Sequence, residues 1–391
     1  MEGVKLDKNG NSKLFSLVVP GLEENRPSVM KGDQIFVKSA RDPQERMFEG
    51  FVHQIQQQSV LIGFGGAFHQ LHVKNMKFDV RFTVGRYPLR NMHRAVSLAN
   101  DNILRTLFPR VEMLPPTQSP LPNFRCFNQL IERNEKQLLA VKHIVAGSAG
   151  PVPYLVFGPP GTGKTVTMVE AIKQVAKLSS GCHILASAPS NTAADLLTER
   201  LMTHIVKKDI LRMHAPSRLQ TGIPSKVREV SNIGSGDRYI YPNVETLQGY
   251  KVIVTTLVTA GRLATAMFPP DHFTHIFIDE SGQAQEPETV IAMTGLLRGA
   301  RGRVVMAGDP RQLGPVIRSS LAVRHGLNNS LLERLMSLDM YNMDGSGQYD
   351  QRCITKLVKN FRSHIELLTV PKQLFYNNEL EACADPVGAT S

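Results

Sequence analysis

The chain has 391 residues, of which 42% are hydrophobic and 20% are charged, a composition typical of folded domains and not of disordered chains. Lys and Arg outnumber Asp and Glu by 45 to 34, and the resulting net charge of +11 favours a polyanionic partner, with surface charge for solubility as the alternative. No apolar run approaches the roughly 18 residues that span a bilayer, the first ten residues are too polar for a signal peptide, and four scattered cysteines argue against a disulfide framework or zinc site.

Residues 1–88 are predicted to form a small accessory β-barrel. Short segments that alternate in polarity or run apolar are separated by Gly, Asp and Pro turn signals, which is typical of antiparallel strands. These segments are residues 14–20, 34–37, 48–55, 59–64 and 77–83. Their His, Lys and Arg residues could form a nucleic-acid face, although a solvated strand face fits the pattern about as well.

Residues 89–127 are predicted to form a stalk helix and a linker. Apolar residues recur at helical spacing over residues 90–108, so one helix should lead away from the barrel. Five prolines between residues 109 and 122 favour an extended connection.

Residues 128–352 are predicted to form a motor domain in which strands and helices alternate, as in a parallel sheet covered by helices on both faces. A helix is expected over residues 128–145, and strands over 154–157, 183–188, 252–255, 275–278 and 303–307. Further helices are expected over 166–178, 191–206, 260–267, 286–297 and 331–336. Residues 213–250 should form a surface insertion and residues 340–352 a polar loop. A strand over 354–358 and a helix over 365–375 follow in residues 353–391.

A phosphate-binding loop follows the strand 154–157. The order strand, G-x-x-x-x-G-K-T, helix places backbone N–H groups and a helix N-terminus around phosphate oxygens. Lys164 would reach the β- and γ-phosphates, and the Thr165 hydroxyl would hold Mg²⁺. The loop consists of Gly158, Pro159, Pro160, Gly161, Thr162, Gly163, Lys164 and Thr165. The motif predicts binding of a nucleoside triphosphate, with an ordinary Gly-rich turn as the alternative.

Two further strands end in polar residues that suit the same chemistry. Asp279 and Glu280 follow the strand 275–278, where Asp279 would hold Mg²⁺ through its water shell and Glu280 would polarise the attacking water. Gln312 follows the strand 303–307, and its neutral amide can contact the γ-phosphate or the attacking water without titrating.

Five motifs in this order resemble those of superfamily 1 helicases of the up-frameshift type. They lie at residues 158–165, 188–195, 279–283, 308–313 and 360–364. Residues 282–288, 356–364 and 380–386 are similar to the Armitage and Mov10-like RNA helicases of small-RNA silencing. The resemblance implies a RecA-like P-loop sheet preceded by the barrel and stalk, and a second RecA-like domain that residues 353–391 begin but cannot complete, so the chain is interpreted as a partial product.

The resemblance also implies roles for particular residues. Asn134 and Gln137 match adenine-reading positions, with two exposed helix amides as the alternative. Arg362 matches an arginine that reaches the γ-phosphate from the second motor domain. Contacts to the nucleic-acid backbone are implied for Ser190, Asn191, Thr192, Thr255 and Thr256.

The function that the resemblance implies is that of an ATP-dependent RNA helicase. Such an enzyme is an RNA-stimulated ATPase that uses ATP and Mg²⁺ and translocates 5′ to 3′ on single-stranded RNA. The family context implies small-RNA or piRNA-mediated gene silencing, Argonaute or Piwi-type partners, and a cytoplasmic location in ribonucleoprotein granules. Two alternatives stay open: a nucleotide-responsive RNA clamp or adaptor without full turnover, and a superfamily 1 DNA helicase.

Overall fold

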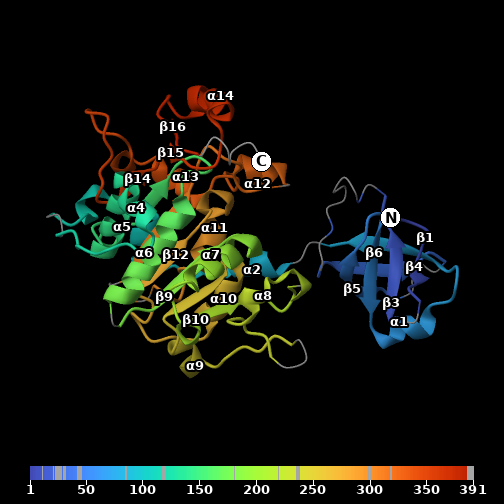
Figure 1. The fold of residues 1–391 in the computed structure, drawn as a ribbon. Coiled ribbons are helices and arrows are strands. Elements are labelled where there is room, and N and C mark those ends of the chain that lie inside the picture. The colour runs from blue at the N-terminus through green and yellow to red at the C-terminus, as the bar shows by residue number, and fades with distance from the viewer. Residues whose placement is uncertain are drawn as a thin grey trace. The chain divides into compact units, whose positions relative to one another are not determined.

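The computed structural model describes residues 1–384 except residues 11, 21, 23–28, 30, 31, 42–45, 84, 85, 117–119, 180, 219, 235–237, 298, 300, 301 and 318. The chain divides into two compact units, Met1–Arg90 and Asn91–Ser391 (Figure 1). Within the described ranges, none of the helices combines the length and hydrophobicity that a bilayer span requires.

The first unit is a near-closed antiparallel barrel, as predicted. Its described strands pair in the order β1-β7-β4-β5-β6-β3-β2. They are β1 (Val4–Lys5), β2 (Asp7–Lys8), β3 (Leu14–Val18), β4 (Gln34–Ser39), β5 (Phe48–Ile55), β6 (Ser59–Phe64) and β7 (Lys77–Phe82). A short helix that the sequence pattern did not predict, α1 (Gly66–Leu71), inserts Phe68 into the core, where its ring lies 5.1 Å from that of Phe15.

The stalk consists of two helices, α2 (Arg86–Ser97) and α3 (Asp101–Leu107), so the prediction of one continuous helix is wrong. The side chain of Asn100 accepts a hydrogen bond from the backbone N–H of Ile103 (3.1 Å) and starts a new helix. A short 3₁₀ turn, η2 (Val111–Met113), lies in the predicted linker.

The second unit contains a parallel sheet in the order β10-β11-β9-β12-β13-β8-β14, which confirms the predicted RecA-like architecture. Most of its strands are buried on both faces, which explains their continuous apolar sequences. The strands are β8 (Tyr154–Phe157), β9 (Ile184–Ala188), β10 (Ile210–Met213), β11 (Val252–Thr256), β12 (His275–Ile278), β13 (Arg303–Gly308) and β14 (Ile354–Lys356).

Helices that accompany this sheet alternate with its strands along the chain. They are α4 (Gln129–Glu132), α5 (Glu135–Ala146), α6 (Lys164–Leu178), α7 (Asn191–Leu201), α8 (Ser225–Arg228), α9 (Val244–Gln248), α10 (Leu257–Thr265), α11 (Glu286–Ile291), α12 (Ser320–Arg324), α13 (Leu331–Met336) and α14 (Ile365–Phe375). Among them, α6 packs against α7, and α10 packs against α11.

Several predicted elements differ from the structure. The helix predicted over residues 128–145 is two helices, α4 and α5, because Asn134 caps α5. The strand β10 was not predicted, and the surface insertion predicted over residues 213–250 buries Ile223, Val227 and Leu247. Its few apolar residues are too widely spaced to show a period, although these three reach the interior.

The segment after the predicted polar loop also departs from expectation. Within that loop, Tyr341 is fully buried and donates its hydroxyl to the backbone oxygen of Pro153 (2.7 Å). The next strand, β14, pairs in parallel with β8 and therefore belongs to the P-loop sheet, although the predicted boundary of the first motor domain was residue 352. Beyond it, β15 (Lys359–Asn360) and β16 (Glu381–Ala382) form a separate parallel pair. The remaining predicted domain limits stay predictions.

Candidate nucleotide and nucleic-acid site

The P-loop packs closely against two other segments. Gly161 and Gly163 have φ values of +79° and +85°, a region that favours glycine. A Cβ on Gly161 would lie 2.7 Å from the Cβ of Arg362, and one on Gly163 would lie 2.5 Å from the side-chain nitrogen of Gln137. The glycines are therefore required both by backbone conformation and by this close packing.

Lys164 begins α6 and points back into the loop. Its Nζ donates hydrogen bonds to the backbone oxygens of Gly158 (2.7 Å) and Pro159 (3.1 Å). Burial lowers its pKa, while the nearby carboxylates of Asp309, Glu280 and Asp279 act to raise it. This ammonium group is thus held at the phosphate-binding loop and faces the carboxylates that follow β12 and β13.

Asp279 ends β12 beside the loop and is almost fully buried. Its carboxylate is hydrogen-bonded by the Thr165 hydroxyl and by the backbone N–H of Glu280 (3.0 Å). Burial, followed by the charge of Glu280, raises the pKa of Asp279 to about 6. Because a hydroxyl and a carboxylate are oxygen ligands of the kind that Mg²⁺ prefers, Thr165 and Asp279 fit the predicted metal site.

Glu280 has a left-handed backbone conformation (φ +52°), which is uncommon for a residue with a side chain and is concentrated at functional sites. Its carboxylate accepts a hydrogen bond from the side-chain nitrogen of Gln283 (3.0 Å). The conformation turns the residue from the end of β12 into the cavity described below.

Gln312 is oriented by Asp309. Its Nε2 donates to the Asp309 carboxylate (2.7 Å), and the hydroxyl of Tyr376 donates to the same oxygen (2.8 Å). The side-chain oxygen of Gln312 is consequently left to accept a hydrogen bond from another group. Tyr376 follows α14 and was not predicted, because nothing in the local sequence indicates a contact with a residue 67 positions earlier.

The segment around Arg362 is fastened to the P-loop by Asn360. The Asn360 amide donates to the backbone oxygen of Pro160 (2.6 Å), and its oxygen accepts from the N–H groups of Arg362 and Ser363 (2.9 Å each). Arg362 is close enough to Lys164 to lower the pKa of that ammonium group.

Asn134 and Gln137 are both buried, so they are not the exposed helix amides of the alternative interpretation. The oxygen of Asn134 accepts from the N–H of Gln137 (3.4 Å) and caps α5. The Gln137 amide nitrogen donates to the backbone oxygen of Gly163 (3.2 Å) and to the Thr167 hydroxyl (3.0 Å). Among the described residues, the amide nitrogen of Asn134 and the side-chain oxygen of Gln137 have no hydrogen-bond partner.

A cavity of about 700 Å³ brings most of the predicted nucleotide-site residues together. Its walls include Asn134, Gln137, Pro160, Gly161, Gly163, Lys164, Thr165, Glu280, Gln312 and Arg362. Gly158, Pro159 and Thr162 support the loop, where the Thr162 hydroxyl donates to the Pro159 oxygen (2.8 Å). The cavity is thus lined by residues that lie from Asn128 to Cys383 in the sequence.

None of the residues predicted to contact RNA is among those that line this cavity: Ser190, Asn191 and Thr192 follow β9, whereas Thr255 and Thr256 end β11. These strands are neighbours in the sheet, so their carboxyl ends share one edge. Ser190, Asn191 and Thr192 are exposed at the start of α7, and Thr256 is half-buried. Thr255 is fully buried and donates its hydroxyl to the backbone oxygen of Met213 (2.9 Å), so the prediction that this side chain contacts RNA is wrong for this structure.

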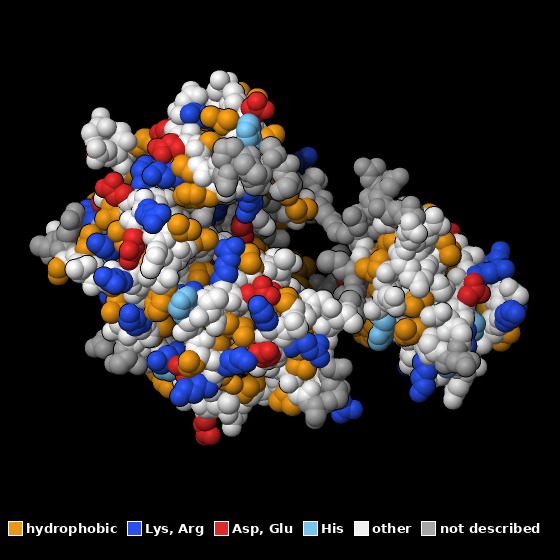
Figure 2. Space-filling view, viewed as in Figure 1, with side chains coloured by type: hydrophobic (Ala, Val, Ile, Leu, Met, Phe, Trp, Pro, Cys, Tyr) orange, Lys and Arg blue, Asp and Glu red, His pale blue; other side chains and the backbone are white. Residues whose placement is uncertain are grey.

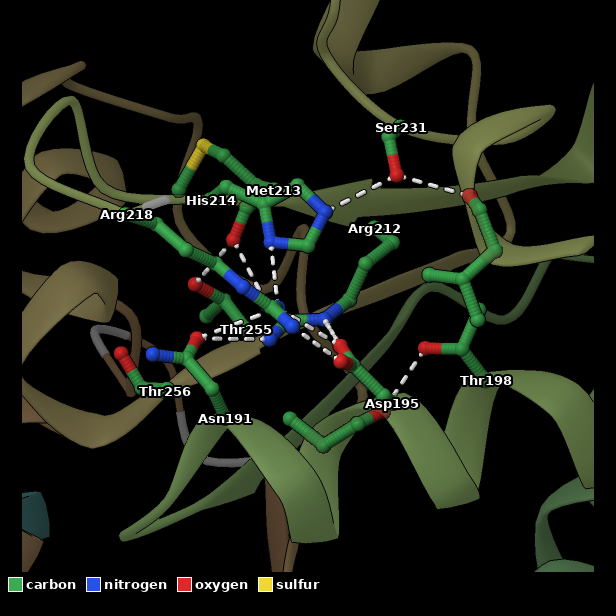
Figure 3. A network of polar contacts seen from close by, with 12 residues as sticks. Asn191, Asp195, Thr198, Arg212, Met213, His214, Arg218, Ser231, Thr255 and Thr256 are labelled. Carbon is green, nitrogen blue, oxygen red and sulfur yellow. Dashed lines mark hydrogen bonds and ion pairs between the residues drawn. The ribbon is translucent and has the colours of Figure 1, made fainter. Parts of the chain in front are cut away.

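A polar network that was not predicted lies directly beneath Asn191 (Figure 3). It centres on Asp195, Arg212 and Arg218, and all three side chains are largely buried. One signal was present in the sequence, because a charged residue inside the apolar run 210–213 is rarely buried without a partner.

Figure 2 shows Lys and Arg side chains distributed among acidic and apolar ones over the visible face, and not gathered in one tract. Polar side chains held in a fixed orientation, such as Asn191, therefore indicate a nucleic-acid interface better than the distribution of Lys and Arg does.

Comparisons with known proteins agree with this geometry. Residues 1–82 match the β-barrel domain of helicase MOV-10, and residues 132–238 and 240–320 match an AAA domain. A Danio rerio protein named as a helicase, mov-10-B.1, is 47% identical over 99% of this chain and 38% of its own length. The RNA helicase Mov10l1 of Homo sapiens is 34% identical over 100% of this chain and 37% of its own. A Drosophila melanogaster protein named as an RNA helicase, armi, is 28% identical over 95% of this chain and 34% of its own.

The two domain matches, together with the barrel and the P-loop sheet, identify the family as that of the superfamily 1 helicases. The chain belongs to the group of these helicases that includes Mov10, Mov10l1 and Armitage. It spans between 34% and 38% of the length of the three relatives described above.

Proposed function

We propose that this chain provides the ATP-binding motor domain and accessory barrel of an ATP-dependent RNA helicase. The observation that carries the proposal is the cavity in which Lys164, Glu280, Gln312 and Arg362 converge from four separate segments. An ammonium group, a carboxylate, an amide and a guanidinium are the groups that phosphoryl transfer from ATP to water requires around the γ-phosphate.

The free amide groups beside the cavity support ATP as the nucleotide. Adenine presents an amino donor next to a ring-nitrogen acceptor. The side-chain oxygen of Gln137 and the amide nitrogen of Asn134 offer the complementary pair, because their other groups are engaged within the protein. This arrangement gives the two residues their proposed role as adenine readers.

The proposed chemistry assigns one task to each remaining residue. Lys164 exchanges its bonds to the loop oxygens for phosphate oxygens, and Arg362 neutralises charge on the γ-phosphate. The Gln312 oxygen orients the attacking water and Glu280 accepts its proton. Thr165 and Asp279 would hold Mg²⁺, which supplies charge neutralisation for the phosphates when it is bound.

We further propose single-stranded RNA as the track, with 5′ to 3′ translocation. The support is the RNA helicase names of Mov10l1 and armi and the exposed polar residues 190–192. A role in small-RNA or piRNA silencing, Argonaute or Piwi-type partners and a location in cytoplasmic granules follow from the same relationship and are part of the proposal.

The test is ATP binding and RNA-stimulated hydrolysis by this chain, with Lys164→Ala and Glu280→Gln as variants. We expect ATP binding that Lys164→Ala abolishes and Glu280→Gln retains, and weak turnover. Unchanged ATP binding by Lys164→Ala would show that the nucleotide site is misassigned. ATP and RNA binding without any RNA-stimulated turnover would favour an RNA clamp. Single-stranded DNA of the same sequence is the comparison that tests RNA as the track, since only RNA offers 2′-hydroxyl groups.

A further inference from the structure

Asp195, Arg212 and Arg218, here called the buried ion cluster, join three parts of the chain under the start of α7 (Figure 3). The Asp195 carboxylate accepts from Arg212 Nε (2.9 Å) and Arg218 Nη1 (2.8 Å), and it also pairs with Arg218 Nη2. Burial acts to raise the pKa of Asp195, but the hydrogen bonds and charges of the two guanidinium groups lower it overall. One carboxylate thus faces two cations, and the cluster carries a net positive charge.

Both arginines also fix the orientation of Asn191. Arg212 Nη2 donates to the side-chain oxygen of Asn191 (3.0 Å), and Arg218 Nη1 donates to the same oxygen (3.3 Å). Since the oxygen faces the guanidinium groups, the amide nitrogen must point the other way, and Figure 3 shows it on the side away from them. Asn191 is exposed, so two N–H donors are presented to solvent above a positive cluster.

We propose that the buried ion cluster is a positioning device that holds the Asn191 amide with its N–H groups outward, to donate to a phosphate oxygen of single-stranded RNA. The inference rests on the proposed function, because RNA binding is part of that function. Asp195, Arg212 and Arg218 act only through Asn191 and the local charge. A donor group next to buried positive charge selects an anionic acceptor, and this contact does not distinguish RNA from DNA because both carry phosphates.

The device also couples RNA binding to the segment between β10 and β11. Arg218 comes from this segment, and its backbone oxygen accepts from the Tyr239 hydroxyl (3.0 Å). The neighbouring His214 accepts from Arg218 on Nδ1 (2.9 Å), and the Tyr241 hydroxyl donates to the His214 backbone oxygen (2.9 Å). Displacement of this segment would withdraw one of the two donors that orient Asn191.

A double-mutant cycle between Asn191→Ala and Arg218→Lys tests the proposal through the affinity for a single-stranded RNA oligonucleotide. Lysine keeps the charge but cannot donate to Asp195, Asn191 and His214 together. Each single change should weaken RNA binding about fivefold, the value of one hydrogen bond, and Asn191→Ala should cause little further loss in the Arg218→Lys background. Arg334→Lys is the matched control, since Arg334 forms an ion pair with Glu286 elsewhere in the same unit (2.6 Å) and should not alter RNA affinity.

A second variant separates the proposed role from a purely structural one, because stability and RNA affinity should change in opposite directions. Asn191→Asp adds a carboxylate to a cluster with excess positive charge, so it should raise thermal stability while weakening RNA binding by about tenfold or more, because it removes the donors and repels phosphate. Unchanged RNA affinity in Asn191→Asp, or a full effect of Asn191→Ala in the Arg218→Lys background, would overturn the inference alone. A wild-type chain that binds ATP but no RNA would overturn the RNA part of the proposed function, and this inference with it.

Discussion

The side-chain amide of Asn360 donates a hydrogen bond to the backbone oxygen of Pro160 (2.6 Å), although the two residues are 200 positions apart in the sequence. Asn360 is also almost fully buried, and its oxygen accepts from two further N–H groups. A single side chain therefore joins the phosphate-binding loop to the segment that carries Arg362.

Replacement of Asn360 by alanine should consequently affect both stability and nucleotide binding. Three partly buried hydrogen bonds are lost, so the free energy of unfolding should fall by about 2–4 kcal/mol, and the affinity for ATP should fall with it. Urea denaturation and titration with a fluorescent ATP analogue measure the two effects. Asn243→Ala, which removes the cap of α9 (2.9 Å to the Thr246 N–H), should cost only about 1 kcal/mol and leave ATP affinity unchanged.

The hydrogen bond between Tyr376 and Asp309 should contribute measurably to stability. Tyr376→Phe removes a hydroxyl that donates to a carboxylate, and the expected loss in the free energy of unfolding is about 1.5–3 kcal/mol. The same change should cost almost nothing when Asp309 is already alanine, which has no acceptor for the Tyr376 hydroxyl. Additive effects of the two substitutions in a double-mutant cycle would contradict a direct interaction.

Thr255 and Thr192 offer a direct comparison of a buried and an exposed threonine. Thr255→Val should lower the free energy of unfolding by about 0.5–1.5 kcal/mol, because its hydroxyl donates to Met213, and should leave RNA affinity unchanged. Thr192→Val should have the reverse effect, a weaker RNA complex with unchanged stability. Fluorescence anisotropy with labelled RNA, beside thermal unfolding, separates the two outcomes.

Glu288 should make stability depend on pH. Burial raises its pKa to about 7, against an ordinary value of 4.5, while a hydrogen bond from the Gln285 backbone acts to lower it. The folded state thus favours the protonated carboxyl, so its contribution to stability is complete below pH 4.5 and is lost as the pH rises through 7.

Glu288→Gln should remove the loss of stability at high pH, because glutamine stays neutral. Relative to wild type, the variant should gain about 1–3 kcal/mol between pH 4.5 and pH 8, with no further gain above that range. Unfolding curves across this interval provide the measurement, and the exposed Glu245→Gln is the matched control. A constant difference between Glu288→Gln and wild type at every pH would contradict the assignment.

The sequence predicted those parts of the site whose signals are local. The P-loop, Asp279 and Gln312 each follow an apolar strand, and parallel strands bring their carboxyl ends to one edge, so their convergence could be inferred before the structure. The helix cap formed by Asn134 could not be predicted from the sequence, because the apolar periodicity continues through the break between α4 and α5. The partners of Asp195 lie 17 and 23 residues away in a stretch without any period, and Tyr376 meets Asp309 only through the tertiary fold.

The pairing of β14 with β8 has a mechanical consequence. Leu357 donates its N–H to the Phe157 oxygen (2.8 Å), so the chain stays bound to the P-loop strand until just before Arg362, which lies six residues after Lys356. Such a short connection allows the segment after Arg362 to rotate relative to the sheet but hardly to move away from it. Because Phe361 also donates its N–H to the Gly161 oxygen (2.9 Å), any swing of α14 must pivot after residue 361, beside the phosphate-binding loop, where a small angular change becomes a larger displacement at the far end of the helix.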